Sequence, residues 1–176
     1  MNQESSRSDR QSNVVQLVGN EVHFGFDIDP KADARLQRAA LLISSKEASA
    51  EALKQAELIA PEQIEVLIAR YKFHFYQGET DRAEKLVLRA IELAAKQGGF
   101  DPDWHNLLPQ TTDWNDPRAP GRFYLYSLKA LAFIRLRQNE RNEAQSLLDT
   151  LARLDPLDQV GAVVIRDLLE AITEDD

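Results

Sequence analysis

Apolar residues recur at a helical period over most of this chain. Residues 61–77 carry one apolar stripe at the spacing of a helical face, made of Ile64, Leu67, Ile68, Tyr71 and Phe75. Residues 80–97 carry a second stripe, made of Ala83, Leu86, Val87, Ala90, Ile91 and Ala94. The pattern predicts two antiparallel helices joined at Gly78, which can adopt the left-handed conformation that ends a helix. Neither helix is apolar all round, so each must bury its stripe against further helices.

The same periodicity continues on both sides of this pair. The helices it predicts span residues 31–43, 47–59, 61–77, 80–97, 121–137, 140–153 and 157–173. Pro61 suits the first position of a helix, Thr80 is placed to cap the next, and Asp155 with Pro156 would start the last. We expect that last helix to cover the apolar end of the stack, with Val160, Val163, Val164, Leu168 and Ile172.

The N-terminal region departs from the helical pattern. Residues 1–13 are polar, and we expect them to be disordered. Val22, Phe24, Phe26 and Ile28 alternate with other residues as in a strand, and Gly19-Asn20 is a candidate hairpin turn. We therefore expect residues 14–30 to form an extended arm lying on the helices. Alternation alone does not distinguish such an arm from a segment that is disordered or bound to a partner. The acidic tail, residues 174–176, is interpreted as solvated charge.

A long loop, residues 96–122, separates the fourth and fifth expected helices. It contains both tryptophans of the chain, Trp104 and Trp114. Loops of this length inside compact domains are usually functional or disordered. Two large aromatic side chains favour order, so we expect them to pack against the neighbouring helices and hold the loop in place.

The helix pairs recur near the ~34-residue period of tetratricopeptide repeats. Alignment on Gly78 places Leu67, Ala83, Val87 and Ala90 on the packing positions of that motif. A second match runs over 124–156 and a weaker one over 31–61, so the chain resembles this family over most of residues 31–156. The resemblance implies an all-α fold. It would be a superhelical array of about three helix pairs plus a C-terminal capping helix, spanning residues 31–173.

The motif is degenerate at the position where a small residue lets paired helices approach. Ala132 fits it in the third repeat, but Tyr71 occupies it in the second and Gln37 in the first. The spacing therefore supports a helix-pair fold without identifying a subfamily by motif.

Four segments carry a narrower resemblance: YKFHFYQ, DPDWHNLLP, RFYLYSLKALAFIRLR and LDPLDQVGA. They are similar to small tetratricopeptide-like proteins found among bacterial nitrogen-fixation genes. This resemblance implies an accessory or assembly factor for nitrogenase maturation, with nitrogenase assembly components as partners. The chain has no cysteine, so such a factor would handle a protein partner rather than ligate a cluster through thiolates.

The family resemblance also implies a concave groove lined by the first helix of each pair. Its groove positions fall on basic and aromatic residues here, namely Lys31, Arg38, Lys72, Phe75, Tyr76, Tyr126, Lys129, Phe133 and Arg137. The partner-binding set we expect is Arg38, Lys72, Tyr76, Tyr126, Lys129, Phe133 and Arg137, together with the loop residues Trp104 and Trp114. A cationic groove on a chain of net charge −8 favours an acidic segment of a protein partner. The alternative is that these are ordinary solvated helix residues.

Composition narrows the function classes further. Hydrophobic content of 43% and charged content of 28% are ordinary for a soluble globular protein. The net charge of −8 argues against non-specific nucleic-acid binding, which needs a basic surface. No apolar run approaches the ~20 residues of a membrane span, and the polar N-terminal residues lack the apolar segment of a signal peptide. Together with the absence of cysteine, these features fit a cytoplasmic protein.

The loop at 100–116 offers the alternative of an enzyme or a small-ligand-binding protein. Asp101, Asp103, His105 and Asp113 could surround a cation or act as acid and base. Aspartate also favours turns and helix caps because it bonds to nearby backbone groups. The sequence contains no glycine-rich phosphate loop, nucleophile elbow or HExxH motif to support catalysis. We therefore expect a non-catalytic scaffold that uses no cofactor or metal.

Overall fold

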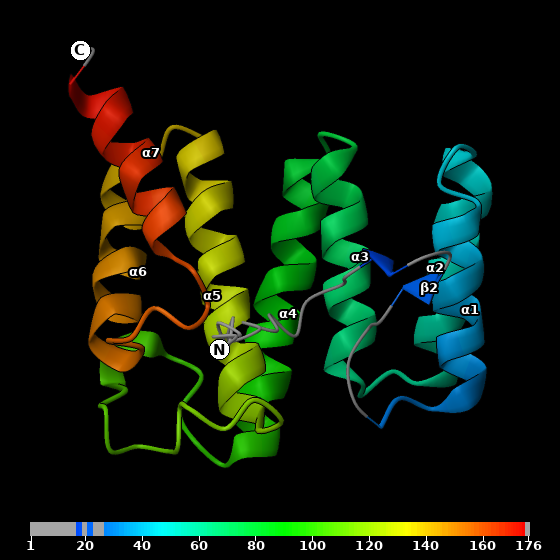
Figure 1. The fold of residues 1–176 in the computed structure, drawn as a ribbon, viewed down its shortest axis with the longest axis horizontal. Helices are drawn as coiled ribbons and strands as arrows, with labels where there is room; N and C mark the ends of the chain where they lie inside the picture. Colours follow the sequence, from blue (N-terminus) through cyan, green and yellow to red (C-terminus); the bar gives the residue numbers. More distant parts are fainter. Residues whose placement is uncertain (1–16, 19–20, 23–26, 175–176) are drawn as a thin grey trace, which may run out of the picture.

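The computed structural model describes residues 17–18, 21–22 and 27–174, and within them the predicted all-helical architecture is confirmed (Figure 1). The helices are α1 (Pro30–Leu41), α2 (Lys46–Ile59), α3 (Ile64–Tyr76), α4 (Thr80–Gly98), α5 (Pro120–Arg137), α6 (Arg141–Leu154) and α7 (Val163–Glu174). One short 3-10 turn, η1 (Trp104–Asn106), lies in the long loop. In the described part of the chain, no helix is long and apolar enough to cross a membrane.

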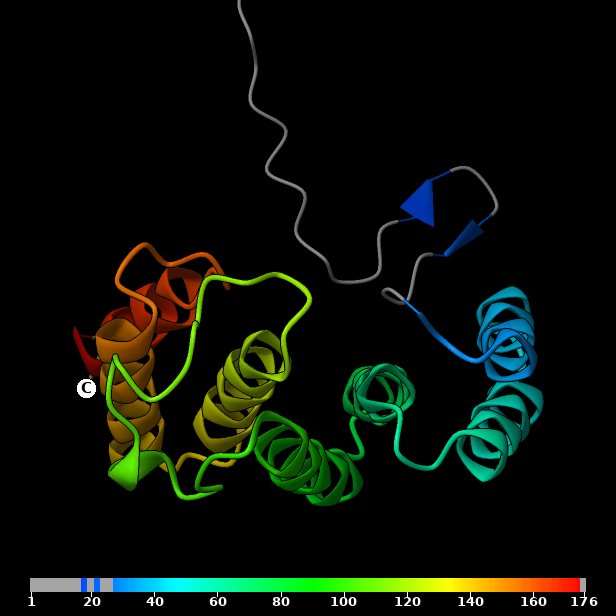
Figure 2. The ribbon, with the colours of Figure 1, turned by 90° about the horizontal axis from the view of Figure 1, so that it is seen from below.

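The helices form two rows. Seen end-on, α1, α3 and α5 lie along one side of the molecule and α2, α4 and α6 along the other (Figure 2). Each helix packs mainly against its neighbour in sequence, and α7 packs against α5 and α6. Helices α3 and α5 also contact each other, because α4 runs antiparallel to both and brings them side by side in the same row.

Helix α3 is buried on two faces. Its predicted stripe joins the larger core, which continues through α4, α5, α6 and the long loop to α7. Its other face, with Val66, Ala69 and Phe73, joins a second core shared with α1 and α2. The burial of Phe73 is explained by this second core, which lies outside the single stripe that periodicity predicts. Glu57 of α2 reinforces the junction by pairing with Arg70 of α3 and with Arg89 of α4.

The junctions around α3 correct two predicted helix termini. Pro61 does not start a helix: residues 61–63 form a turn, and α3 begins at Ile64. Thr80 is the first residue of α4 rather than its cap, and the capping position is Glu79. Gly78 adopts the left-handed conformation as predicted, with φ of +75°.

The start of α7 is also corrected. The sequence predicts a helix from residue 157, but Asp155 and Asp158 accept hydrogen bonds from the backbone amides of Val160 and Ala162, at 2.8 and 2.6 Å. These side-chain bonds hold residues 155–162 in turns, because they satisfy backbone groups that a helix would otherwise pair. The delayed start changes which residues of α7 are buried.

The buried face of α7 is therefore different from the predicted one. Ile165 and Leu169 pack into the core, whereas Val164 and Leu168 are 69% and 40% exposed. Val163 is also exposed, while Val160 is buried in the preceding turn and Ile172 packs partly against the core. The helix still covers the end of the larger core, but with a stripe one position removed from the expected one.

Two short strands precede the helices. β1 (Leu17–Val18) and β2 (Glu21–Val22) pair antiparallel, with Leu17 opposite Val22 and Val18 opposite Glu21. They flank Gly19 and Asn20, where the sequence predicts a turn, and β2 contacts α1. The predictions for residues 1–13, for residues 14–16, 19–20 and 23–26 of the arm, and for the last two residues lie outside the described residues.

Candidate functional site

A groove of about 280 Å³ lies between α3 and α5, beside the turn that leads into α7. We call it the α3–α5 groove. It is lined by Tyr71, Lys72, Phe75, Tyr76, Tyr126, Lys129, Ala130, Phe133, Ile134, Val160 and Ile165. The lining is mostly apolar and aromatic, and its charged side chains are two lysines. Such a composition, apolar walls with a few polar groups, is typical of binding sites.

Aromatic side chains build the walls of the groove. The rings of Phe75 and Phe133 lie 5.0 Å apart across the gap between α3 and α5. Tyr126 is buried below them, and Tyr76 stands at the rim with 80% of its surface exposed. Tyrosine and phenylalanine provide large, rigid contact areas, and one exposed at a rim is available to a partner.

Lys129 is held on one side of the groove by the turn before α7. Its Nζ donates a hydrogen bond of 2.5 Å to the carbonyl oxygen of Val160 and lies 5.7 Å from the ring centroid of Tyr126. Burial lowers the pKa of Lys129, although the carboxylate of Asp158 opposes this effect. The contacts with Val160 and Tyr126 therefore fix the position of this side chain in the groove.

Lys72 faces the same groove without a counter-ion. It is half-buried, and no described residue forms a hydrogen bond or an ion pair with its ammonium group. Burial, and secondly the positive charge of Lys129, lower the pKa of Lys72 to about 8. An unpaired, partly desolvated cation is costly, and an anionic group of a ligand would relieve this cost.

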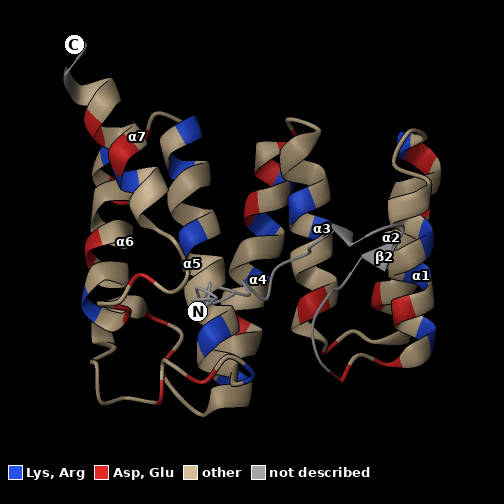
Figure 3. Cartoon of the chain, viewed as in Figure 1, with Lys and Arg blue, Asp and Glu red and all other residues tan. Residues whose placement is uncertain are grey.

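The structure brings together the central residues of the predicted partner-binding set. Lys72, Tyr76, Tyr126, Lys129 and Phe133 all line the α3–α5 groove. The residues of α3 share one helix face because they lie four positions apart, and those of α5 do so because they lie three or four positions apart. The two faces meet because the helices lie side by side. Bands of Lys and Arg are visible along α5 in Figure 3.

The remaining predicted residues lie elsewhere. Arg38 is exposed on α1, and Arg137 is exposed at the end of α5, beyond the groove lining. Trp104 and Trp114 belong to the long loop.

Sequence reasoning missed the contribution of the turn before α7. Val160 in this turn forms part of the groove lining together with Ile165 of α7, and the carbonyl of Val160 positions Lys129. A signal for this turn was present in the sequence, since Asp158 and Gly161 are both typical turn residues. Gly161 has φ of +69°, which favours glycine.

The long loop is ordered around Trp114, as predicted. This residue is only 4% exposed, and its ring lies 5.4 Å from that of Phe100 and 6.1 Å from that of Tyr124. Its indole Nε1 donates to the carbonyl of Leu108 at 3.2 Å. Trp114 is thus a core residue that anchors the loop, whereas Trp104 packs against the core only partly.

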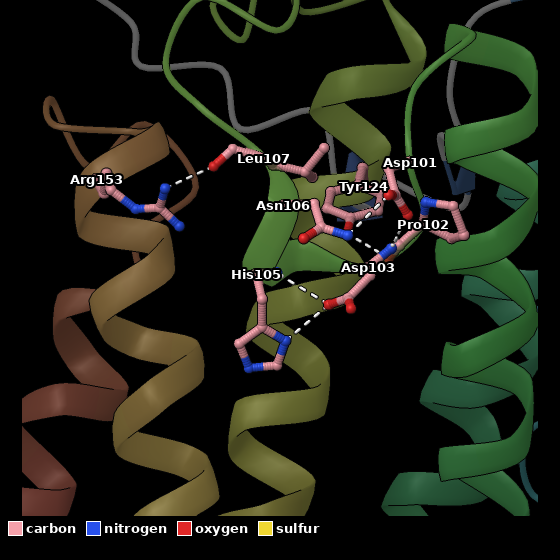
Figure 4. A network of polar contacts seen from close by, with 8 residues as sticks. All are labelled: Asp101, Pro102, Asp103, His105, Asn106, Leu107, Tyr124 and Arg153. Carbon is pink, nitrogen blue, oxygen red and sulfur yellow. Dashed lines mark hydrogen bonds and ion pairs between the residues drawn. The ribbon is translucent and has the colours of Figure 1, made fainter.

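The polar residues of the loop bond mainly to each other and to backbone groups (Figure 4). Asp101 accepts from the amide of Asp103 and from the side chain of Asn106, each at 2.9 Å. Asp103 accepts from both the amide and Nδ1 of His105, and these hydrogen bonds lower the pKa of Asp103. Every one of these contacts is typical of turns and caps.

The remaining loop residues fit the same interpretation. Asp113 accepts from the amide of Asn115 at 3.0 Å. Tyr124 and Arg153 attach the loop to α5 and α6 by donating to the carbonyls of Pro102 and Leu107. Among the described residues, no group of three or more histidine, aspartate or glutamate side chains is arranged to hold a metal ion.

Comparison with known proteins yields a distant relative. A protein of Azotobacter chroococcum mcd 1, described as an uncharacterized 19.8 kDa protein in the nifW 5' region, is 27% identical over 119 residues. The match covers 66% of this chain and 67% of the relative. No family model matches the chain, and no solved structure matches it. The description of the relative gives a position near nifW and no activity.

Proposed function

We propose that this chain is a non-catalytic scaffold that holds an acidic segment of a protein partner in the α3–α5 groove. The observation that carries the proposal is Lys72, a half-buried cation in an aromatic groove with no counter-ion among the described residues. Lys129 lies in the same groove and adds a second positive charge.

The physical argument combines charge with contact area. A carboxylate of the partner would pair with the desolvated ammonium groups, while Phe75, Tyr76 and Phe133 would pack against its neighbouring side chains. The rest of the chain is acidic, with a net charge of −8, so a basic groove would orient an acidic segment during association.

The arrangement of the helices supports a tetratricopeptide-like array as the architecture of this scaffold. Antiparallel neighbours alternate between two rows, and α1, α3 and α5 form one continuous side. In such an array the first helices of the pairs make the inner surface, which is where the α3–α5 groove lies.

The relative near nifW supports an association with nitrogen fixation. Within that setting, we propose a cytoplasmic accessory factor for nitrogenase maturation, with a nitrogenase assembly component as the protein partner. This role needs no cofactor in the chain itself.

Affinity capture from nitrogen-fixing cells of the source organism tests the proposal. The baits are the wild type, the double variant Lys72→Glu/Lys129→Glu, and the control Lys54→Glu/Lys85→Glu, which makes the same charge change at exposed positions on α2 and α4. We expect nitrogenase assembly components to bind the wild type and the control and to be lost from the groove variant. Equal capture by all three folded baits would refute the proposal.

A further inference from the structure

A second depression lies between the same two helices, near their N-terminal ends. It has a volume of about 280 Å³, and its charged lining consists of Asp27, Glu62, Glu65 and Arg118. Three carboxylates thus share the site with one guanidinium. Its charge balance is opposite to that of the α3–α5 groove, which contains two lysines.

Glu65 is the central residue of this acidic depression. Its exposure is only 8%, and no described side chain forms a hydrogen bond or an ion pair with its carboxylate. Burial raises the pKa of Glu65. A hydrogen bond from its own backbone amide opposes this effect, and the nearby charge of Asp27 adds to it. The neighbouring Glu62, by contrast, is paired with Lys96 at 2.9 Å. Glu65 therefore lacks a cation in the described part of the molecule.

The acidic and basic sites lie on the same face of α3. Glu65 and Lys72 are seven residues apart, which is close to two helical turns and about 10 Å along the axis. On α5, Phe123 lines the acidic depression and Tyr126 lines the basic groove, one turn further along. The two unpaired charges consequently face the same side at a fixed separation.

We infer that this face of α3 and α5 binds an extended protein segment that carries a basic and an acidic residue about three positions apart. An extended chain rises about 3.3 Å per residue, so three residues span the ~10 Å between the two sites. The basic residue pairs with Glu65 and the acidic residue with Lys72. The inference rests on the proposed function and specifies the chemistry of its partner.

Charge complementarity favours this ligand over a uniformly acidic one. A segment with acidic residues at both positions would place a carboxylate beside Glu65, and like charges at a desolvated site are strongly unfavourable. A segment with the two opposite charges satisfies both unpaired groups and can bind in one direction only. The pattern therefore provides specificity as well as affinity.

Selection from a display library of random 12-residue peptides, with the full chain as bait, tests the inference. We expect the selected peptides to contain Lys or Arg and Asp or Glu two to four residues apart. For such a peptide, Glu65→Gln and Lys72→Met should each weaken binding at least roughly tenfold. The matched control Glu92→Gln, at an exposed position on α4, should leave affinity unchanged.

A double-mutant cycle assigns the contact. Replacing the basic residue of the peptide by an uncharged one should weaken binding to the wild type but not to Glu65→Gln, because that variant has already lost the interaction. Calorimetric titration gives both affinities. Additive losses would show that the basic residue and Glu65 do not meet, which would overturn the inference.

The remaining outcomes separate this inference from the proposed function. Uniformly acidic peptides that depend on Lys72 and not on Glu65 would overturn the inference and leave the proposed function standing. Peptides indifferent to both residues would overturn both. A synthetic peptide of residues 1–16, which contains charges of both signs, serves as competitor. If this peptide bound more tightly than every selected peptide, the groove would be a binding site for the N-terminal segment of this chain. The inference of a separate protein partner would then be wrong.

Discussion

Lys72 has the properties of a side chain that lowers the stability of the free protein, and in the function we propose it contributes to binding. It lines the groove together with aromatic residues of α3 and α5, and Lys129 adds repulsion instead of a counter-charge. A residue selected only for stability at this position would be apolar. Retaining a cation there is the pattern expected of a functional group, since binding sites often trade stability for function.

Replacing Lys72 by methionine should therefore stabilise the free protein and weaken partner binding. In the folded state the pKa of Lys72 is lowered to about 8 from its ordinary value of 10.5, so the unfolded chain binds more protons between these pH values. The destabilising contribution is complete below pH 8 and disappears as the pH rises towards 10.5. Thermal unfolding at pH 7 should show a Tm a few degrees higher for Lys72→Met, and the difference should vanish near pH 10.5. An unchanged or lower Tm of the variant at pH 7 would show that Lys72 does not destabilise the free protein.

Trp114 is a second residue whose role the structure defines. It packs against Phe100 and Tyr124, and Gly121 at the start of α5 leaves room for the indole, because a Cβ there would approach Trp114 to 3.3 Å. Trp114→Ala should cost about 3–5 kcal/mol of unfolding free energy through the lost contacts and the cavity. Urea denaturation measures this cost. Trp104→Ala, at the partly exposed tryptophan, should cost clearly less, and equal costs would show that the loop is not anchored as described.

At the scale of elements, two carboxylates link α2, α3 and α4, namely Glu57 and Glu79. Glu79 precedes α4 and contacts Lys46 at the start of α2 and His74 in the last turn of α3, each at 2.6 Å. Hydrogen bonds from Lys46 and then His74 lower the pKa of Glu79 to about 2. The smaller core of α1 and α2 is thus attached to the rest of the molecule by a polar cluster as well as by the second face of α3.

Glu79→Gln should lower stability at neutral pH and have little effect in acid. A carboxylate with a depressed pKa contributes stability above its ordinary value of 4.5, and this contribution is lost as the pH falls towards 2. The Tm of the variant should therefore lie below that of the wild type at pH 7, and the two should converge near pH 2. A difference in Tm that is independent of pH would show that the contacts of Glu79 with Lys46 and His74 do not stabilise the protein through the charge of the carboxylate.

The sequence predicted the elements better than their junctions. Apolar periodicity located all the described α-helices, because each buries a stripe at a regular spacing. It failed at Pro61 and at residues 157–162, where aspartate side chains and tertiary contacts decide the conformation. The basic and aromatic lining of the groove was expected from the resemblance to tetratricopeptide repeats, whose groove positions fall on these residues of α3 and α5. The contributions of Val160 and Glu65 were not, because they depend on which turns and helices meet in space.

At the scale of the whole molecule, we propose that the side formed by α3 and α5 binds a protein. Two opposite, unpaired charges and exposed aromatic surface lie on this side. The opposite row, formed by α2, α4 and α6, also carries exposed apolar residues such as Leu58, which is 74% exposed. A direct test must therefore compare the two sides.

Site-specific photo-crosslinking makes this comparison. A photoreactive amino acid is placed at Tyr76, on the rim of the α3–α5 groove, or at Leu58 on α2, and cells of the source organism are irradiated under nitrogen-fixing conditions. We expect a defined protein adduct from position 76 and none from position 58, with acidic residues in the crosslinked peptide of the partner. An adduct from position 58 alone, or no adduct from either position in a folded chain, would contradict this proposal.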